Sequence, residues 1–215
     1  MILTQPTIAV IEDDTSMRQS IIKIFDSVDI NTQPYTCAEE FLNDDLAHIS
    51  CIISDVRLRG ISGPSLLNEI SRRQHQIPVI IISGYADIEM AVGCLLQGAV
   101  NFFSKPFRNQ ALLDCVLYHL QKSQSQKAYQ ERKQAYGQRH SILTSREKNV
   151  LELIVRGRLS KNVALELNIS KNTVDVHRVN IMKKMQVNTA GKLISEAVYF
   201  GYYKKELHKE FMPTS

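Results

Sequence analysis

The segments CIISD, residues 51–55, and VIIIS, residues 79–83, decide the fold that we predict for the first half of the chain. Their apolar residues follow one another without the polar alternation of a strand that has one face in water. Strands that are apolar on both faces are typical of a parallel sheet between two layers of helices. A polar residue follows each apolar run, Asp55 in the first segment and Ser83 in the second.

Similar runs alternate with segments of helical periodicity through the first 121 residues. The expected strands are Thr7–Ile11, Asn31–Tyr35, Ile49–Ser54, Pro78–Ser83 and Val100–Ser104. The expected helices lie near 16–28, 38–46, 64–73, 87–97 and 108–121. Five strand–helix units predict a doubly wound α/β domain with a five-stranded parallel sheet over residues 1–121.

Charge divides the chain into two parts. Residues 1–120 contain 8 basic and 14 acidic residues, whereas residues 121–215 contain 18 basic and 8 acidic residues. This asymmetry indicates two folding units with different partners, although a basic surface can also be merely solvated. Residues 122–140 have almost nothing to bury and predict a linker, either a solvated extension of the preceding helix or a flexible tether.

Helical periodicity replaces the strand runs after residue 140 and predicts a small all-α domain over residues 141–203, followed by a polar tail, 204–215. The sequence TSRE, residues 144–147, is a capping box that opens the first helix. Asn168 and Ile169 form a tight turn between the second and third helices. The second, third and fourth helices are expected to begin at the caps Ser160, Ser170 and Thr189.

We expect a cytoplasmic chain without a signal peptide or a membrane span. The N-terminus lacks a basic region followed by an apolar run, and the longest apolar runs have the length of strands. The four cysteines form no CxxC pair and lie in apolar segments. They indicate core packing in a reducing compartment rather than disulfides or a metal site.

Acidic, hydroxyl and lysine side chains follow four of the expected strands. Glu12 and Asp13 follow the first strand, Asp55 the third, Ser83 the fourth and Lys105 the fifth. Because the carboxyl ends of parallel strands share one edge, these side chains should converge. Polar loops are ordinary after any one strand, but four such ends together favour a functional pocket. Clustered carboxylates need a cation, and Mg²⁺ suits an all-oxygen site.

Four motifs of this region resemble those of the receiver domain of two-component response regulators. They are IEDD (11–14), DVRLRGISG (55–63), ISGYAD (82–87) and SKPF (104–107). The resemblance covers residues 6–121. It implies the strand order 2-1-3-4-5 and phosphotransfer to Asp55 from a sensor histidine kinase.

The same resemblance implies a role for each residue of the pocket. Asp55 is the nucleophile that becomes phosphorylated, and Ser83 and Lys105 contact the phosphoryl group. The implied Mg²⁺ ligands are Glu12, Asp13, Asp55 and the main-chain carbonyl of Arg57. Ser83 and Phe102 are the implied switch residues, and the peptide bond before Pro106 is expected to be cis. The chain departs from the family in having Arg59 where proline is common and Phe102 where tyrosine is common.

Residues 160–185 read as helix, tight turn, helix. In the second helix Val174, Ile181 and Met185 recur at helical spacing and should face the core. The opposite face has basic flanks, which suits a helix in the major groove, although an ordinary amphipathic surface helix has the same pattern.

The segments LTSREKNVLELIVRG (143–157) and SKNVALELNISKNTVDVHRVNIMKKMQV (160–187) are similar to the LuxR-type helix-turn-helix module. A receiver followed by this module is the architecture of the NarL/FixJ class of response regulators. The family pattern implies base reading by Asp175, Val176 and Val179. The implied phosphate contacts are Lys171, Thr173, His177, Arg178 and Lys184, and Asn172 and Lys183 complete the DNA-facing set.

We therefore expect a phosphorylation-dependent transcription regulator rather than an enzyme, apart from catalysis of its own phosphotransfer and dephosphorylation. The implied partners are a sensor histidine kinase, double-stranded DNA and a second copy of the phosphorylated chain, with RNA polymerase as a further candidate. The face of the fourth helix and fifth strand, or the helix from Thr189 to Phe200, would form the dimer. An aspartate-nucleophile phosphatase is disfavoured because Arg57 stands where a second aspartate is needed. A DNA-binding protein with a relic receiver is disfavoured by the complete pocket.

Overall fold

The computed structural model describes residues 5–85 and 87–202. The chain divides into two compact units, Met1–Gln126 and Lys127–Ser215. One residue of the ISGYAD motif, Ala86, and the predicted tail over residues 204–215 lie outside the described residues.

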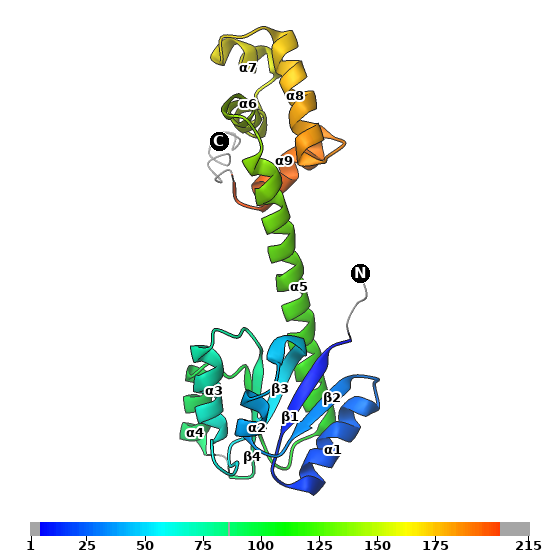
Figure 1. Cartoon of the computed structure of the whole chain (residues 1–215), viewed down its shortest axis with the longest axis vertical. Helices are drawn as coiled ribbons and strands as arrows, with labels where there is room; N and C mark the ends of the chain where they lie inside the picture. Colours follow the sequence, from blue (N-terminus) through cyan, green and yellow to red (C-terminus); the bar gives the residue numbers. More distant parts are fainter. Residues whose placement is uncertain (1–4, 86, 203–215) are drawn as a thin grey trace, which may run out of the picture. The chain divides into compact units, whose positions relative to one another are not determined.

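The first unit contains a parallel sheet in the order β2-β1-β3-β4-β5, which confirms the predicted α/β fold and strand order (Figure 1). Its strands are β1 (Thr7–Ile11), β2 (Asn31–Tyr35), β3 (Ile49–Asp55), β4 (Val79–Ser83) and β5 (Asn101–Ser104). The helices between them are α1 (Thr15–Asp26), α2 (Ala38–Leu42), the 3-10 turn η1 (Leu46–His48), α3 (Gly63–Arg72), α4 (Ile88–Leu96) and α5 (Asn109–Ser141). The helix predicted over 38–46 ends at Leu42, because Asp45 accepts a hydrogen bond from the Ala47 amide and begins a separate turn.

Helices cover both faces of this sheet, as the uninterrupted apolar strands require. Consecutive residues of β3 belong to different cores. Ile52 packs with residues of α2, α3 and α4, whereas Ile53 packs with residues of α1 and α5. The buried strand runs therefore fix the sheet between two helical layers.

The second unit contains α6 (Ser145–Val155), α7 (Ser160–Glu166), α8 (Lys171–Met185) and α9 (Ala190–Tyr199). The capping box at Thr144 and the caps Ser170 and Thr189 are confirmed. Asn168 has a φ of 51°, which the tight turn requires. The prediction that Ser160 caps α7 is wrong: Leu159 occupies the N-cap position, and its side chain makes no cap hydrogen bond.

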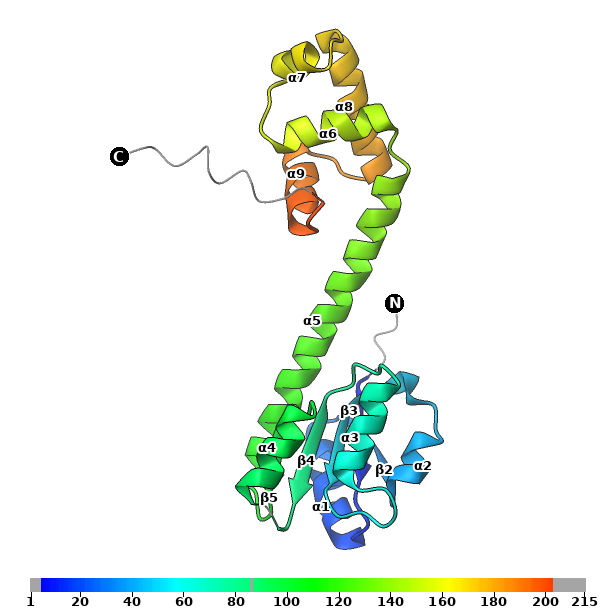
Figure 2. The same ribbon diagram turned by 90° about the vertical axis from the view of Figure 1, so that its left-hand side faces the viewer.

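The predicted linker is helical, because α5 continues without interruption to Ser141 (Figure 2). The expectation that it buries almost nothing is wrong. Tyr136 is fully buried, and it packs with α6, α8 and α9 in the core of the second unit. Tyr129 packs against the same core. The last turns of α5 are therefore part of the second unit's folded structure.

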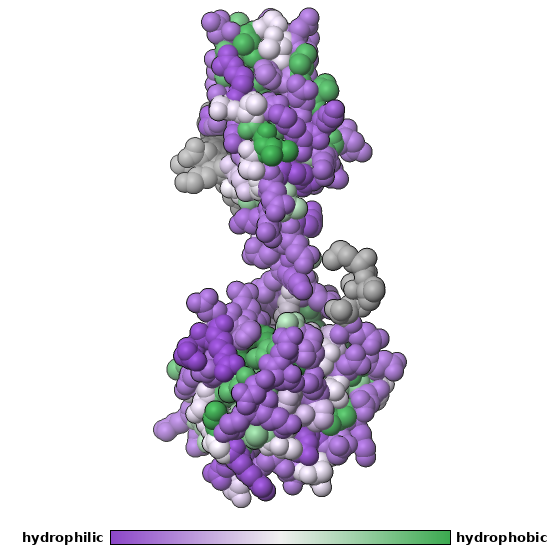
Figure 3. Space-filling view, in the orientation of Figure 1, coloured by the Kyte–Doolittle hydropathy of each residue, from purple (hydrophilic) through white to green (hydrophobic). Residues whose placement is uncertain are grey.

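The face of the molecule drawn in Figure 3 is mainly hydrophilic, with small apolar patches on both units. None of the helices within the described ranges combines the length and the apolar character needed to cross a bilayer.

Candidate functional sites

The acidic pocket lies at the carboxyl edge of the sheet. β1 and β3 are neighbours, with Ile11 paired to Ser54, so Glu12 and Asp55 follow at adjacent positions. Both side chains are buried, with Glu12 2% and Asp55 6% exposed. The Lys105 ammonium lies 2.6 Å from Glu12 Oε2 and 2.6 Å from Asp55 Oδ1. The structure thus brings together three of the predicted pocket residues.

Backbone contacts at the ends of β4 and β5 hold Lys105 in this position. The Lys105 amide donates to the Ser83 carbonyl at 2.7 Å, and the Lys105–Pro106 peptide bond is cis, as the family pattern implied. The Arg57 amide donates to Asp55 Oδ2 at 2.7 Å. Each carboxylate oxygen of Asp55 therefore accepts one hydrogen bond within the described chain, one from the ammonium and one from the backbone.

Burial and charge shift the pKa values in this pocket. Burial raises the pKa of Glu12, and the nearby Asp55 carboxylate adds to this rise, while Lys105 opposes it. For Lys105 burial acts in the opposite direction, but its hydrogen bonds to Asp55 and Glu12 prevail and raise the pKa above its ordinary value. Lys105 is therefore a charged group that partly neutralises a crowded acidic site.

The remaining acids of the IEDD motif have different contacts. Asp13 pairs with the exposed Arg59 at 3.5 Å, and Asp14 caps α1 by accepting a hydrogen bond from the Met17 amide at 2.7 Å. Within residues 5–85 and 87–202, no three histidine, cysteine or acidic side chains are gathered closely enough to hold a metal ion. Of the predicted Mg²⁺ ligands, Glu12 and Asp55 converge around Lys105, while Asp13 turns to Arg59.

The hydroxyl of Ser83 is buried beside this pocket, where it accepts a hydrogen bond from the Tyr85 amide at 3.2 Å. Phe102 is half-buried and packs against the core that α2, α3 and α4 share. Sequence reasoning missed Tyr85, whose ring lies 4.5 Å below the Arg57 guanidinium and joins the loops that follow β3 and β4. The position of Tyr85 in the ISGYAD motif was the sequence feature that could have identified it.

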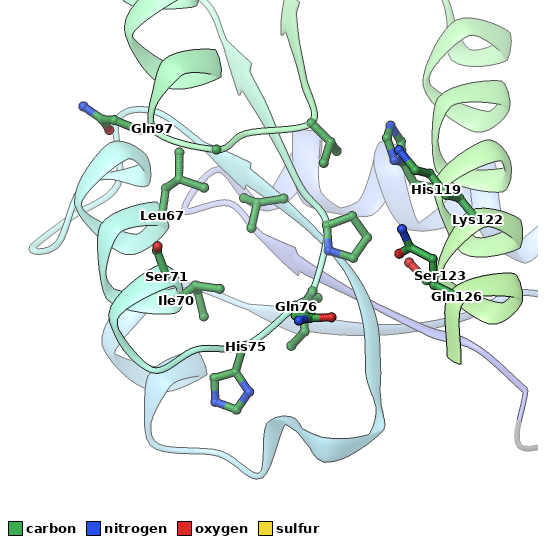
Figure 4. A pocket seen from close by; sticks show the side chains of 15 residues that line it. Leu67, Ile70, Ser71, His75, Gln76, Gln97, His119, Lys122, Ser123 and Gln126 are labelled. Carbon is green, nitrogen blue, oxygen red and sulfur yellow. The ribbon is translucent and has the colours of Figure 1, made fainter. Parts of the chain in front are cut away.

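A separate pocket of the first unit lies away from these residues (Figure 4). Residues of α3 and α5 line it, together with Pro78 and Val79 at the start of β4. It therefore lies toward the amino edge of β4, whereas the acidic pocket lies at the carboxyl edge. None of the residues predicted for phosphorylation lines it.

The outer face of α8 forms the second candidate site. Val174, Ile181 and Met185 are buried in the core, as the helical spacing predicted. A hollow on the opposite side is lined by Asn172, Asp175, Val176, Val179 and Asn180. Val176 and Val179 are 59% and 66% exposed, so their methyl groups are available for contact.

The polar and basic residues predicted to surround this hollow fall into two groups. Lys171, Thr173 and Lys183 are exposed, and His177 and Arg178 are half-buried. Lys184 differs, because its ammonium lies 2.7 Å from the buried carboxylate of Glu147, which also forms the capping box of α6. Lys184 thus links α8 to α6, while its side chain stays 34% exposed.

Ser160 contacts the side of α8 that the sequence predicts to face DNA. Its hydroxyl donates to Asp175 Oδ1 at 3.1 Å and accepts from Arg178 Nη1 at 3.2 Å. Sequence reasoning had assigned this hydroxyl to helix capping and therefore missed both contacts.

Comparison with known proteins matches both units of the chain. The family model for the response regulator receiver domain matches residues 8–117, and the model for bacterial regulatory proteins of the luxR family matches residues 141–197. The response regulator protein TodT of Pseudomonas putida is 37% identical over 188 residues, which cover 87% of this chain and 83% of TodT. The transcriptional regulatory protein FixJ of Azorhizobium caulinodans is 35% identical over 193 residues, covering 89% and 92% of the two chains.

Two solved structures extend over nearly the whole chain. The response regulator StyR is 34% identical, has a TM-score of 0.76 and covers 91% of this chain and 99% of its own. Full-length FixJ from B. japonicum is 32% identical, has a TM-score of 0.58 and covers 94% and 100%. With both units matched and relatives aligned along most of their length, this chain belongs to the two-component response regulators of the NarL/FixJ class, transcription regulators that join a receiver domain to a LuxR-type DNA-binding domain.

Proposed function

We propose that Asp55 is the residue of this regulator that accepts a phosphoryl group from a sensor histidine kinase. The observation that carries this proposal is the buried Asp55 carboxylate with the Lys105 ammonium at 2.6 Å. A strand-end aspartate beside a fixed cation can act as a nucleophile toward phosphorus. The chain then catalyses no reaction beyond its own phosphorylation and dephosphorylation.

The pocket residues divide the work of phosphotransfer. An oxygen of Asp55 attacks phosphorus, so that an O–P bond forms, the P–N bond of the kinase phosphohistidine breaks, and the imidazole leaves. Lys105 contacts two carboxylates, and its ammonium can turn to a phosphoryl oxygen as negative charge accumulates there. The Ser83 hydroxyl proton, which bonds to none of the described residues, is available to donate to the phosphoryl group.

The donor set of this pocket fits Mg²⁺, because its carboxylate and carbonyl oxygens are the ligands that this ion prefers. Glu12, Asp13, Asp55 and the Arg57 carbonyl would hold it, and when bound it supplies positive charge to the phosphoryl oxygens. Burial and, to a lesser extent, the nearby Asp55 carboxylate raise the pKa of Glu12, and a bound cation would favour the charged form of both carboxylates. Asp13 is available, because its contact with Arg59 involves an 88% exposed side chain and costs little to break.

Phosphorylation should favour a homodimer through the face of α4 and β5. Ile88 and Leu96 are 83% and 84% exposed, and Val92 and Leu95 are also exposed on this helix. Ser83 and Phe102 act as the switch in this proposal, because they lie at β4 and β5 beside α4. On α9, Leu193 and Ala197 are buried in the core of their own unit, so a second dimer surface on this helix would use exposed residues such as Val198.

The DNA-binding unit presents α8 to the major groove. Asp175, Val176 and Val179 face the bases, while Asn172 lies beside them in the same hollow. The proposed phosphate contacts are Lys171, Thr173, His177, Arg178 and Lys184, and Lys183 completes the DNA-facing set. We place the chain in the cytoplasm, where its four free cysteines stay reduced and RNA polymerase is within reach.

Incubation with Mg²⁺ and a small phosphodonor, followed by intact-mass measurement, tests this function. We expect one phosphoryl group on the wild-type chain and tighter operator binding after it is added. Phosphoryl uptake without any change in operator binding would show that phosphorylation does not control DNA binding, and it would contradict the proposed regulation.

A further inference from the structure

We propose that Ser160 is a positioning residue that gives Asp175 its preference for one base. The inference rests on the proposed insertion of α8 into the major groove. It concerns which base pair this chain reads and which residue outside α8 determines that choice.

The position of Ser160 in α7 leaves its hydroxyl available. Leu159 is the N-cap of this helix, so Ser160 is its first residue and serves no capping role. Its hydroxyl instead reaches α8, where it donates to Asp175 Oδ1 at 3.1 Å and accepts from Arg178 Nη1 at 3.2 Å. The Ser160 hydroxyl thus donates its proton to the Asp175 carboxylate and accepts a hydrogen bond from the Arg178 guanidinium.

This arrangement keeps Asp175 apart from Arg178. The two residues are three positions apart on α8, a spacing at which an acid and a base can pair directly. Within the described part of the chain no ion pair joins them, and the Ser160 hydroxyl instead bonds to both. A direct bidentate pair would occupy both carboxylate oxygens. With Ser160 in place, Oδ2 has no hydrogen-bond partner among the described residues and can accept from DNA.

The chemistry of the hollow indicates which base Asp175 accepts from. A carboxylate only accepts hydrogen bonds, so it needs an amino group in the major groove, either cytosine N4 or adenine N6. The adenine amino group lies between two acceptors, N7 of its own base and O4 of thymine, which repel a carboxylate. The cytosine amino group has such an acceptor on one side only. Asp175 should therefore read a C·G pair, and the exposed methyl groups of Val176 and Val179 suit an adjacent thymine methyl.

Removal of the Ser160 hydroxyl should remove this preference without removing DNA binding. Asp175 and Arg178 would then close into a direct pair, which withdraws the carboxylate from the base. A substitution that keeps the hydroxyl should keep the preference. Of the proposed phosphate contacts only Arg178 would be drawn into this pair, so affinity for random DNA should fall by no more than the share of one phosphate contact.

Selection from a random duplex library with the phosphorylated full-length chain tests the proposal. Wild type should enrich a motif with one C·G pair that Asp175→Ala loses. Ser160→Ala should lower the preference for that pair by at least about fivefold, the lower end of what one base contact contributes. Ser160→Thr, the matched control, should retain it. Asp175→Asn should lose the cytosine preference, because its amide also donates and favours adenine.

Three outcomes would overturn the inference. If Ser160→Ala retains the C·G preference that Asp175→Ala loses, Ser160 does not position Asp175. If Asp175→Ala and Asp175→Asn both enrich the parental motif, Asp175 does not read a base. If wild type enriches no motif, the proposed use of α8 is itself wrong, a failure distinct from the other two. A thermal melt of each variant checks its fold, and Ser160→Thr and Asp175→Asn decide the matter if Ser160→Ala unfolds.

Discussion

Replacement of Lys184 by methionine should lower the free energy of unfolding of the second unit by about 2 kcal/mol. The Glu147 carboxylate accepts hydrogen bonds from the Thr144 amide at 2.8 Å, the Thr144 hydroxyl at 3.0 Å and the Lys184 ammonium at 2.7 Å. Removal of one partner of a buried ion pair costs about 3–5 kcal/mol. We take a smaller value because the Lys184 side chain is 34% exposed and water screens the pair.

The size of this effect should depend on pH. Burial raises the pKa of Glu147, but Lys184 and Thr144 outweigh it and hold the pKa below its ordinary value. A carboxyl with a lowered pKa contributes stability that is present above its unfolded-state pKa and is lost as pH falls through the folded-state pKa. The difference between wild type and Lys184→Met should therefore be largest at neutral pH and shrink as Glu147 becomes protonated.

Hydrogen exchange of the α8 amides in the full-length chain measures the free energy of unfolding of the second unit alone. A loss of 2 kcal/mol should speed exchange from the unfolded state roughly 30-fold at pH 7. Lys183→Met is the matched control, because Lys183 is exposed and forms no ion pair in the described chain. The free energy of unfolding of the Lys183→Met variant should stay within about 0.5 kcal/mol of that of wild type. Equal exchange rates in the two variants would refute a stabilising role for the Lys184–Glu147 contact.

Three further predictions concern function and domain structure. Asp55→Asn should take up no phosphoryl group by intact-mass measurement, and the same uptake in wild type and variant would refute the assignment. Leu96→Asp should prevent phosphorylation-dependent dimerisation in analytical ultracentrifugation while leaving phosphoryl uptake unchanged; a normal dimer would exclude the α4 face. A fragment of residues 127–215 should unfold at a higher urea concentration than a fragment of residues 141–215, because the shorter fragment lacks the buried Tyr136, and an aromatic side chain contributes about 3–5 kcal/mol in a core. Equal midpoints would show that the end of α5 does not stabilise the second core.

The sheet and the acidic pocket could be predicted because each rests on a local signal. Apolar runs such as CIISD mark strands that are buried on both faces, and the order of the strands brings Glu12, Asp55 and Lys105 together. The partner of each pocket residue could not be read in the same way. Asp13 turns to Arg59, and Lys105 lies between two acids, because the packed loops determine these orientations.

Three other positions show where local patterns fail. Ser160 matched a helix cap, but the helix begins one residue earlier and the hydroxyl serves a contact with α8. At Lys184 the family pattern implied a phosphate contact, which stays a prediction, but it gave no sign of the ion pair with the buried Glu147 of α6, 37 residues earlier in the chain. Tyr136 lies in a polar segment whose composition suggests solvent exposure, yet it completes a core built from other helices. Each missed contact involves a partner distant in sequence.

The pairing of β3 with strands on both sides fixes the position of Asp55 along the sheet edge, since Ser54 pairs with Ile11 and Asp55 with Ile82. Insertion of one residue within β3 would shift Asp55 past this edge by the length of a residue. It would also exchange the faces to which Ile52 and Ile53 point, so each side chain would enter the opposite core. Length variation should therefore be tolerated in the loops around this strand and not within it, and the tolerance of the strand to insertion measures how strictly the scaffold sets the reach between Asp55 and Lys105.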